Sequence, residues 1–165
     1  MNGTHSHAVD RLLQHYQDPY VCEVYDDGGA LAATASMHLV GERKLLSLAN
    51  IGTVESDDFV YIYSLPVLDE ASFERLYSEA LEHGVARVDP NPNHNFSLIS
   101  ILFLCDSIDA AAAAKLKKTK YSKKFSRPQR GTIDLRLAAV EVDGRGKAAN
   151  PLGKSLLNIY KDALR

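Results

Sequence analysis

A run of basic residues is the feature of the sequence with the clearest chemical potential. Eight lysines and arginines lie within the 16 residues 115–130, and no acidic residue occurs between Asp109 and Asp134. Two aromatic residues, Tyr121 and Phe125, lie among these cations. Because cations neutralise phosphates and aromatic rings stack on bases, this pattern is typical of a surface that binds phosphate or nucleic acid. The basic residues are Lys115, Lys117, Lys118, Lys120, Lys123, Lys124, Arg127 and Arg130, of which we select Lys117, Lys118 and Lys120 as anion-binding candidates.

The same cations also have a purely structural interpretation. Lysines near the carboxyl end of a helix interact favourably with the helix dipole. Lysines on an edge strand discourage other chains from adding to the sheet. The acidic residues elsewhere leave the whole chain with a net charge of -2, so the overall composition does not indicate a nucleic-acid partner. The basic segment can therefore be a solvated helix end followed by an edge strand, and a surface for a protein partner is the third alternative.

Three further residues are candidates for a metal site. Asp106 follows a long apolar segment, at a position where open α/β sheets often place ligands. With Asp109 it could hold a divalent cation, and His94, between two asparagines in a predicted loop, could complete the site. A metal-dependent hydrolase built on these residues requires the three side chains to converge. Helix capping explains both aspartates without any ligand.

A second charged group lies on one predicted strand. Asp134 and Arg136 are two residues apart, so on a strand they share a face. They could pair with the lysine-rich segment and with Asp106, which makes Arg136 a fourth anion-binding candidate. The alternative is an exposed sheet face with a network of salt bridges.

Recognised catalytic motifs are not found in the sequence. It has no Gly-x-x-x-x-Gly-Lys-Ser/Thr loop, no Gly-x-Gly-x-x-Gly, no Gly-x-Ser-x-Gly and no Cys-x-x-Cys. The predicted order of elements is similar to the core of the restriction-endonuclease-like nucleases, and this resemblance implies a Mg²⁺ site with an Asp/Glu-x-Lys triplet on a strand. Here Glu55, Asp57 and Asp58 fall in a predicted loop between strands 45–54 and 59–65, and neither strand carries the triplet. We therefore expect no such active site, since element order alone is a weak analogy.

The elements that must position these residues centre on the segment 96–105. It is apolar on both alternating faces, which predicts a strand covered on both sides, and it is too short to cross a bilayer. Helical stripes predict helices over 8–16 and 69–84, the second with Asp69 as its N-cap. A third helix is expected to start at Asp106 or Ser107, and a fourth is expected at the end of the chain, capped by Asn150. Further strands are predicted over 20–25, 31–40, 45–54, 59–65, 121–125 and 132–142, with turns at 26–29 and 41–44.

Length and composition limit the protein to one soluble domain. The chain has 165 residues, 45% of them hydrophobic, and fits a single α+β domain over 1–165 with a mixed, mostly antiparallel sheet and helices packed on it. The start of the chain lacks the basic and apolar regions of a secretory signal, so we expect a cytoplasmic protein without a membrane partner. Cys22 and Cys105 are then expected to be buried, reduced thiols. We expect no cofactor.

The second half of the chain resembles an uncharacterised family of small single-domain proteins from anaerobic Gram-positive bacteria. The resemblance covers roughly residues 93–160, and the alanine run 110–114 departs from it. It implies no activity, cofactor or partner. The similar pieces are Asp106-Ser107-Ile108-Asp109, Lys117-Lys118-Thr119-Lys120-Tyr121, Asp134-Leu135-Arg136-Leu137, and Asn150 with Gly153-Lys154.

Three functional hypotheses follow. No catalytic constellation can be assembled from the residues, which favours a non-enzymatic domain that associates with itself or with a protein partner. The second hypothesis is phosphate or nucleic-acid binding through residues 115–130. The third is the metal-dependent hydrolase near Asp106.

Overall fold

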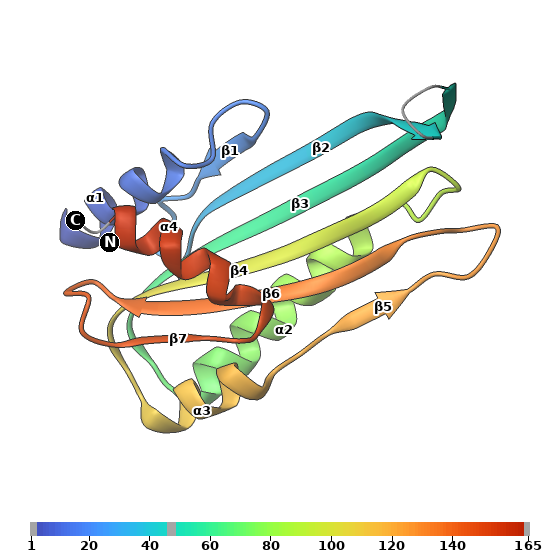
Figure 1. Ribbon diagram of the computed structural model, residues 1–165. Coiled ribbons are helices and arrows are strands. Elements are labelled where there is room, and N and C mark those ends of the chain that lie inside the picture. The colour runs from blue at the N-terminus through green and yellow to red at the C-terminus, as the bar shows by residue number, and fades with distance from the viewer. Residues whose placement is uncertain (1–2, 46–48, 164–165) are drawn as a thin grey trace.

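The computed structural model describes residues 3–45 and 49–163, and among these residues 44–45 and 49–51 are described without their side chains. Within these described residues the chain forms four α-helices, one short 3₁₀ helix and seven strands (Figure 1). In chain order these are α1 (Gly3–Leu13), β1 (Val21–Val24), β2 (Leu31–Leu45), β3 (Ala49–Leu68), α2 (Glu70–Arg87), β4 (His94–Ile108), α3 (Ala110–Lys118), β5 (Ser122–Lys124), β6 (Thr132–Glu141), β7 (Lys147–Ala149), η1 (Leu152–Ser155) and α4 (Leu156–Ala163).

All seven strands belong to one mixed sheet. The strand order is β1-β2-β3-β4-β6-β5, and β7 pairs with β6 beyond β5 along the same edge. The central strands β3, β4 and β6 run parallel, and the other pairs are antiparallel. Two crossovers, through α2 and α3, join the parallel strands. The predicted α+β class and mixed, mostly antiparallel sheet are confirmed.

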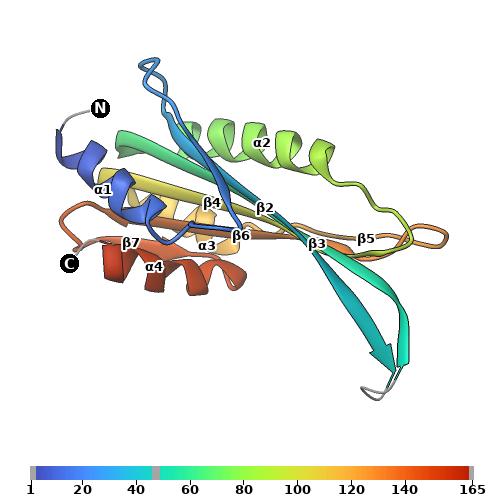
Figure 2. The same ribbon diagram turned by 90° about the horizontal axis from the view of Figure 1, so that it is seen from above.

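The sheet separates two hydrophobic cores. One core packs α2 and α3 against one face of the sheet. The other packs α1 and α4 against the opposite face. Figure 2 shows α2 running along its face, whereas α1 and α4 lie together over only one half of the other face. Alternating side chains of β4 enter the two cores, and residues 99–105 are all buried, so the prediction of a central strand covered on both sides is confirmed here.

The polar stretch 55–58 was predicted as a loop, and this is wrong. It lies within β3, which continues without a break from Ala49 to Leu68 and pairs with β2 on one side and β4 on the other. The predicted turn at 41–44 is likewise part of β2. The physical reason is that the carboxylates of Asp57 and Asp58 find hydrogen-bond partners on neighbouring strands, so this polar segment can be buried in a sheet.

Helix starts were predicted with mixed success. Asp69 caps α2, since its carboxylate accepts a hydrogen bond from the Ser72 N–H at 2.7 Å. Asp106 does not cap α3, because β4 continues through Asp106 to Ile108. Asp109 is the residue before α3, and its side chain makes no capping hydrogen bond. The longer strand follows from its pairing with β3, which extends to Ile108.

Asn150 was predicted to cap the last helical segment with Pro151 as its first residue, but η1 starts at Leu152 and Pro151 holds the N-cap position. The Asn150 side chain still accepts from an N–H of η1, and it joins three parts of the chain. Its side chain is 1% exposed. Its Oδ1 accepts hydrogen bonds from the N–H groups of Leu137, at 3.0 Å, and Gly153, at 2.7 Å. Its Nδ2 donates to the carbonyls of Thr119, at 3.1 Å, and Leu135, at 3.0 Å. One amide therefore holds the end of α3, the strand β6 and the start of η1 together.

The cysteines differ from each other. Cys105 is buried, and burial raises the pKa of its thiol to about 12, with the neighbouring charge of Asp106 as a smaller cause. Cys22 was also predicted to be buried, but it is exposed on the edge strand β1, where its thiol donates to the carbonyl of Tyr16. Both are free thiols. Within the described residues, no helix combines the length and apolar character needed to span a membrane.

Candidate anion-binding site

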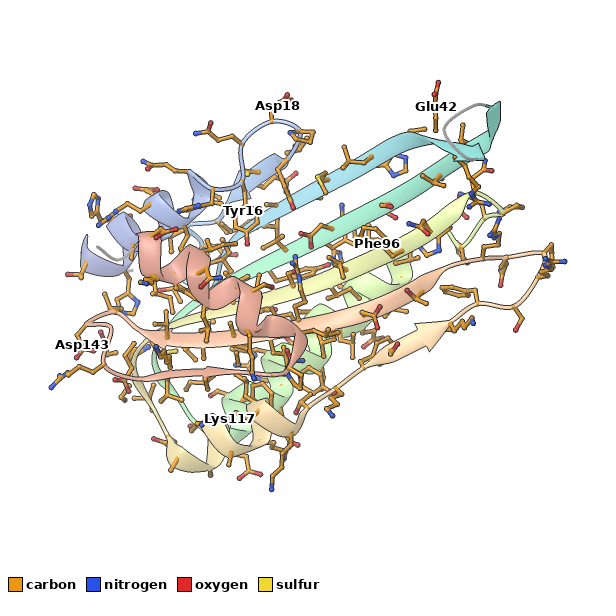
Figure 3. The ribbon with its side chains drawn as sticks, viewed as in Figure 1. Tyr16, Asp18, Glu42, Phe96, Lys117 and Asp143 are labelled. Carbon is orange, nitrogen blue, oxygen red and sulfur yellow. The ribbon has the colours of Figure 1, made fainter. Side chains whose placement is uncertain are left out.

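No helix of the described residues covers one half of one sheet face. Side chains two residues apart on a strand share a face, so Asp58 lies on the same face as Val60 and Ile62, which α1 and α4 cover. Toward the other end of the strands this face carries mixed side chains. Figure 3 labels Phe96 on the part of the strands that the ribbon of α4 leaves uncovered. We call it the open half-face, and it comprises Met37, Leu39, Ser56, Asp58, Phe96, Leu98, Thr132, Asp134 and, on β5, Lys124.

A basic pocket lies at the end of the open half-face. It has a volume of about 420 Å³ and is bounded by the start of β4, the β5–β6 hairpin and the distal part of β2. Four of its described lining residues carry a permanent positive charge, and none of these described residues carries a carboxylate. Such a set of donors matches the oxygens of a phosphate or a similar anion. The lining residues are Arg43, His94, Asn95, Lys124, Phe125, Arg127, Gln129, Arg130 and Gly131.

His94 holds the basic hairpin in place. Its Nδ1 donates a hydrogen bond to the carbonyl of Arg130 at 2.7 Å, and its ring lies edge-on to Phe125. Gly131 follows with a φ of +86°, and a Cβ there would stand 2.6 Å from the carbonyl oxygen of Asn95. A glycine is therefore required, because any side chain would push the hairpin away from β4. Arg130 is positioned by this contact.

His94 is itself fixed by a series of polar groups on the opposite face of the sheet, against which α2 and α3 pack. Its Nε2 contacts the Ser97 hydroxyl at 2.9 Å, and that hydroxyl donates to Asp57 at 2.9 Å. The other oxygen of Asp57 accepts from Nδ1 of His38 at 2.7 Å. Both nitrogens of His94 are thus used within the protein, so neither is left for a metal.

His38 makes the stability contributed by this series of polar groups dependent on pH. Its hydrogen bond to Asp57 raises the pKa of the imidazole above its ordinary value of 6.5. The protonated form is therefore favoured by folding, so this contribution to stability is present below about pH 6.5 and is lost as the pH rises through the higher folded pKa. We expect an NMR titration of His38, assigned with a His38→Gln variant, to show a midpoint above 6.5. A midpoint at or below 6.5 would contradict the hydrogen bond.

A buried ion pair crosses the inner border of the open half-face. Arg136 donates to Asp58 at 2.7 Å, and Ser100 and Tyr20 each donate to the same carboxylate at 2.8 Å. The side chains of Asp58 and Arg136 are only 4% and 19% exposed. Burial, and secondly the charge of Asp58, raise the pKa of the Tyr20 hydroxyl well above its ordinary value. The carboxylate of Asp58 therefore joins the strands β3, β4 and β6 with the segment that precedes β1.

The three predicted metal ligands do not converge. His94 and Asp106 occupy opposite ends of β4, separated by about 40 Å at the rise of an extended strand. Asp106 contacts Nε2 of His5 at 2.9 Å, and Asp109 is exposed before α3. Across residues 3–45 and 49–163, no group of three or more metal-ligating side chains comes together. A hydrolase site built from these three residues is not assembled.

The anion-binding candidates are distributed over two places. Lys117, Lys118 and Lys120 are exposed around the end of α3 and do not line the basic pocket. Arg136 pairs with Asp58 and not, as considered, with Asp106. Lys115, at the start of the basic segment, pairs with Glu70 and Glu74 of α2.

The pocket cations come from the end of the segment and from β2. Lys124, Arg127 and Arg130 belong to the predicted basic segment, although they were not selected from it. Arg43 was missed entirely, because it was assigned to a turn and is 81 positions before Lys124. The density of cations was a usable signal for the hairpin, whereas no local signal identified Arg43.

Comparison with known proteins gives a family. The family model described as "Domain of unknown function (DUF8052)" matches residues 4–162. This match covers both halves of the chain, whereas the resemblance noted in the sequence covered only the second. No curated protein and no solved structure has a significant match to the chain.

Proposed function

The chain belongs to the DUF8052 family, and we propose that it is a binding protein whose basic pocket takes a phosphate-bearing anion. The observation that carries this proposal is the lining of the pocket. Arg43, Lys124, Arg127 and Arg130 surround about 420 Å³ without an opposing carboxylate in that lining. An origin in anaerobic Gram-positive bacteria and a cytoplasmic location stay predictions.

The electrostatics support an anion as the ligand. The whole chain carries a net charge of -2, so four cations in one pocket form a local excess that the composition does not explain. Arginine guanidinium groups offer paired donors that match two oxygens of a phosphate. The phosphate can belong to a small molecule or to a nucleic-acid backbone, and the two sources share this chemistry.

Removing two of the cations tests the proposal. We expect the double variant Arg127→Ala/Arg130→Ala to bind pyrophosphate at least about a hundredfold more weakly than the wild type. Two charge-assisted contacts are lost, and each contributes about 1.5–3 kcal/mol. Isothermal titration calorimetry at low salt measures the effect. Both side chains are exposed, so the fold is expected to be retained, which circular dichroism checks.

The matched control is Lys117→Ala/Lys118→Ala. It removes the same charge from the end of α3, outside the pocket, and is expected to leave pyrophosphate binding almost unchanged. Equal losses in both double variants would mean that only the net charge matters. Wild-type protein that binds no pyrophosphate at low salt would remove the proposal.

Self-association is the second candidate function, and the edge of the sheet supports it. β1 pairs with β2 only up to Ser36, and beyond it no described strand covers the outer edge of β2. On this edge Leu39 is 45% and Val40 is 62% exposed. An uncovered, partly apolar edge is a template for pairing with another strand.

A charged residue on this edge tests self-association. If the edge pairs with a second copy, light scattering coupled to size exclusion gives a dimer mass for the wild type and a monomer mass for Val40→Lys. Val67→Lys is the matched control, since Val67 is also an exposed apolar strand residue but lies near the opposite end of β3. A wild type that is monomeric at every concentration tested excludes this candidate.

A further inference from the structure

We infer that the ligand of the basic pocket is a single-stranded nucleic acid, with a base stacked on Phe96 of the open half-face. This inference rests on the proposed function and specifies its ligand. It requires that an exposed aromatic ring, the basic pocket and the uncovered sheet surface of the open half-face lie next to one another. The described residues provide all three at the same end of the sheet.

Phe96 is placed to stack a base beside the pocket. It follows Asn95, which lines the pocket, and it is 36% exposed on the central strand. Its neighbours across the sheet are Ser56 on β3 and Thr132 on β6, and Thr132 in turn pairs with Lys124. Phe96 and Lys124 therefore share one row of one face, about 10 Å apart at two strand spacings. A nucleotide whose phosphate is held by Lys124 can reach the ring with its base.

The cations around Phe96 suit more than one phosphate. Arg43 comes from β2, and Lys124 comes from β5, so the two approach the pocket from opposite sides of the central strand β4. Arg127 and Arg130 add charge from the hairpin between β5 and β6. A polynucleotide presents a phosphate at every residue, and a positive groove beside an aromatic platform is the usual way in which single strands are bound without sequence preference.

The open half-face carries two carboxylates as well as its cations. Asp58 is paired with Arg136 and buried beneath the surface. Asp134 accepts a hydrogen bond from the hydroxyl of Thr132, is partly buried and keeps its negative charge. The four cations that line the basic pocket outnumber this carboxylate.

The open half-face also favours a single strand over a duplex. Stacking on Phe96 requires access to the flat side of a base, which a duplex hides within its own stack. The ring of Phe96 on the exposed sheet surface can stack with a base of a single strand, because that base is not held in the stack of a double helix. Duplex binding to the same cations would use phosphates alone and would not depend on Phe96.

A pair of substitutions at Phe96 tests the inference. Phe96→Leu removes the ring and keeps an apolar side chain, whereas Phe96→Tyr keeps the ring. Fluorescence anisotropy with labelled oligo-dT and oligo-U measures binding, with a duplex of equal length and pyrophosphate as comparison probes. We expect F96L to weaken oligonucleotide binding about tenfold to a hundredfold, F96Y to bind like the wild type, and neither to change pyrophosphate affinity.

The salt dependence of binding gives a second readout. The logarithmic slope of oligonucleotide affinity against salt should become shallower by about 1.4 in the Arg127→Ala/Arg130→Ala variant, since each phosphate contact to a single strand contributes about 0.7 to the slope. The slope should stay unchanged in F96L. The salt dependence therefore distinguishes the contribution of the arginine charges from that of base stacking, even if one Phe96 variant is poorly folded.

Different outcomes overturn the inference and the proposed function. Unchanged oligonucleotide affinity in F96L, or a duplex bound as tightly as the single strand, overturns the inference. If the wild type still binds pyrophosphate in that case, the proposed function stands. If the wild-type protein binds neither pyrophosphate nor oligonucleotide, the inference and the proposed function are both overturned.

Discussion

Replacing Asp58 with alanine is expected to lower the free energy of unfolding by about 3–5 kcal/mol. The carboxylate accepts hydrogen bonds from Arg136, Ser100 and Tyr20, and its side chain is 4% exposed. Alanine would leave the largely buried guanidinium of Arg136 without its counter-charge, and this uncompensated charge is the main cost. Urea denaturation followed by circular dichroism measures the loss.

A double variant distinguishes the buried charge from the lost packing. Asp58→Leu combined with Arg136→Met removes both charges together, and we expect it to be clearly more stable than Asp58→Ala. Asp143→Ala is the surface control, because Asp143 forms an ion pair with Arg145 on an exposed turn. We expect no measurable change there, since exposed pairs contribute little. If Asp58→Ala is as harmless as this control, the buried pair does not stabilise the sheet as argued.

The second large effect is expected for Asn150→Asp, which keeps the shape of the side chain and changes only its hydrogen-bonding groups. The two hydrogen bonds that Nδ2 donates to Thr119 and Leu135 would be replaced by an oxygen facing two carbonyl oxygens. A buried donor or acceptor without a partner costs about 1–3 kcal/mol, so we expect a loss of about 3–5 kcal/mol at neutral pH. Thermal or urea unfolding measures it.

The pH dependence of Asn150→Asp identifies the cause. Burial beside carbonyl oxygens raises the pKa of the new carboxyl in the folded state above its unfolded value of about 4. The folded variant then binds more protons than the unfolded chain, so its stability falls as the pH rises. The deficit relative to the wild type should narrow as the pH falls through the raised folded pKa, because the protonated carboxyl can again donate, and should be smallest below about pH 4.

Asn158→Asp is the matched control for this substitution. It makes the same chemical change at an exposed position of α4 and should cost little. An equal loss at both positions, or a deficit at Asn150 that does not change with pH, would contradict the role assigned to its amide.

Local patterns predicted the elements whose burial is decided by neighbouring residues. The central strand was identified because both alternating faces of residues 96–105 are apolar except at Ser97 and Ser100. Asp69 and Asn150 were identified as helix starts because their side chains satisfy N–H groups only a few positions ahead. These signals act over short distances along the chain, so the sequence displays them directly.

The stretch 55–58 shows where local patterns fail. Asp57 and Asp58 are charged, and a charged pair between apolar runs is typical of a loop. Their burial depends on Ser97, Ser100 and Arg136, which are 40, 42 and 78 positions away. Only the pairing of distant strands reveals that these carboxylates have partners.

By itself the sequence determined the class of the fold, the central strand and the presence of a concentrated basic segment. The tertiary structure alone decided which cations act together: Lys115 pairs with α2, Lys117 and Lys118 face solvent, and Arg43 joins Arg127 and Arg130 around one pocket. The physical reason is that helix and strand periodicity depends on residues within a few positions, whereas a binding site depends on strand order and register. Those are set by the antiparallel pairing of β2 with β3 and by the two crossovers, which together bring residues 43, 94 and 130 to the same end of the sheet.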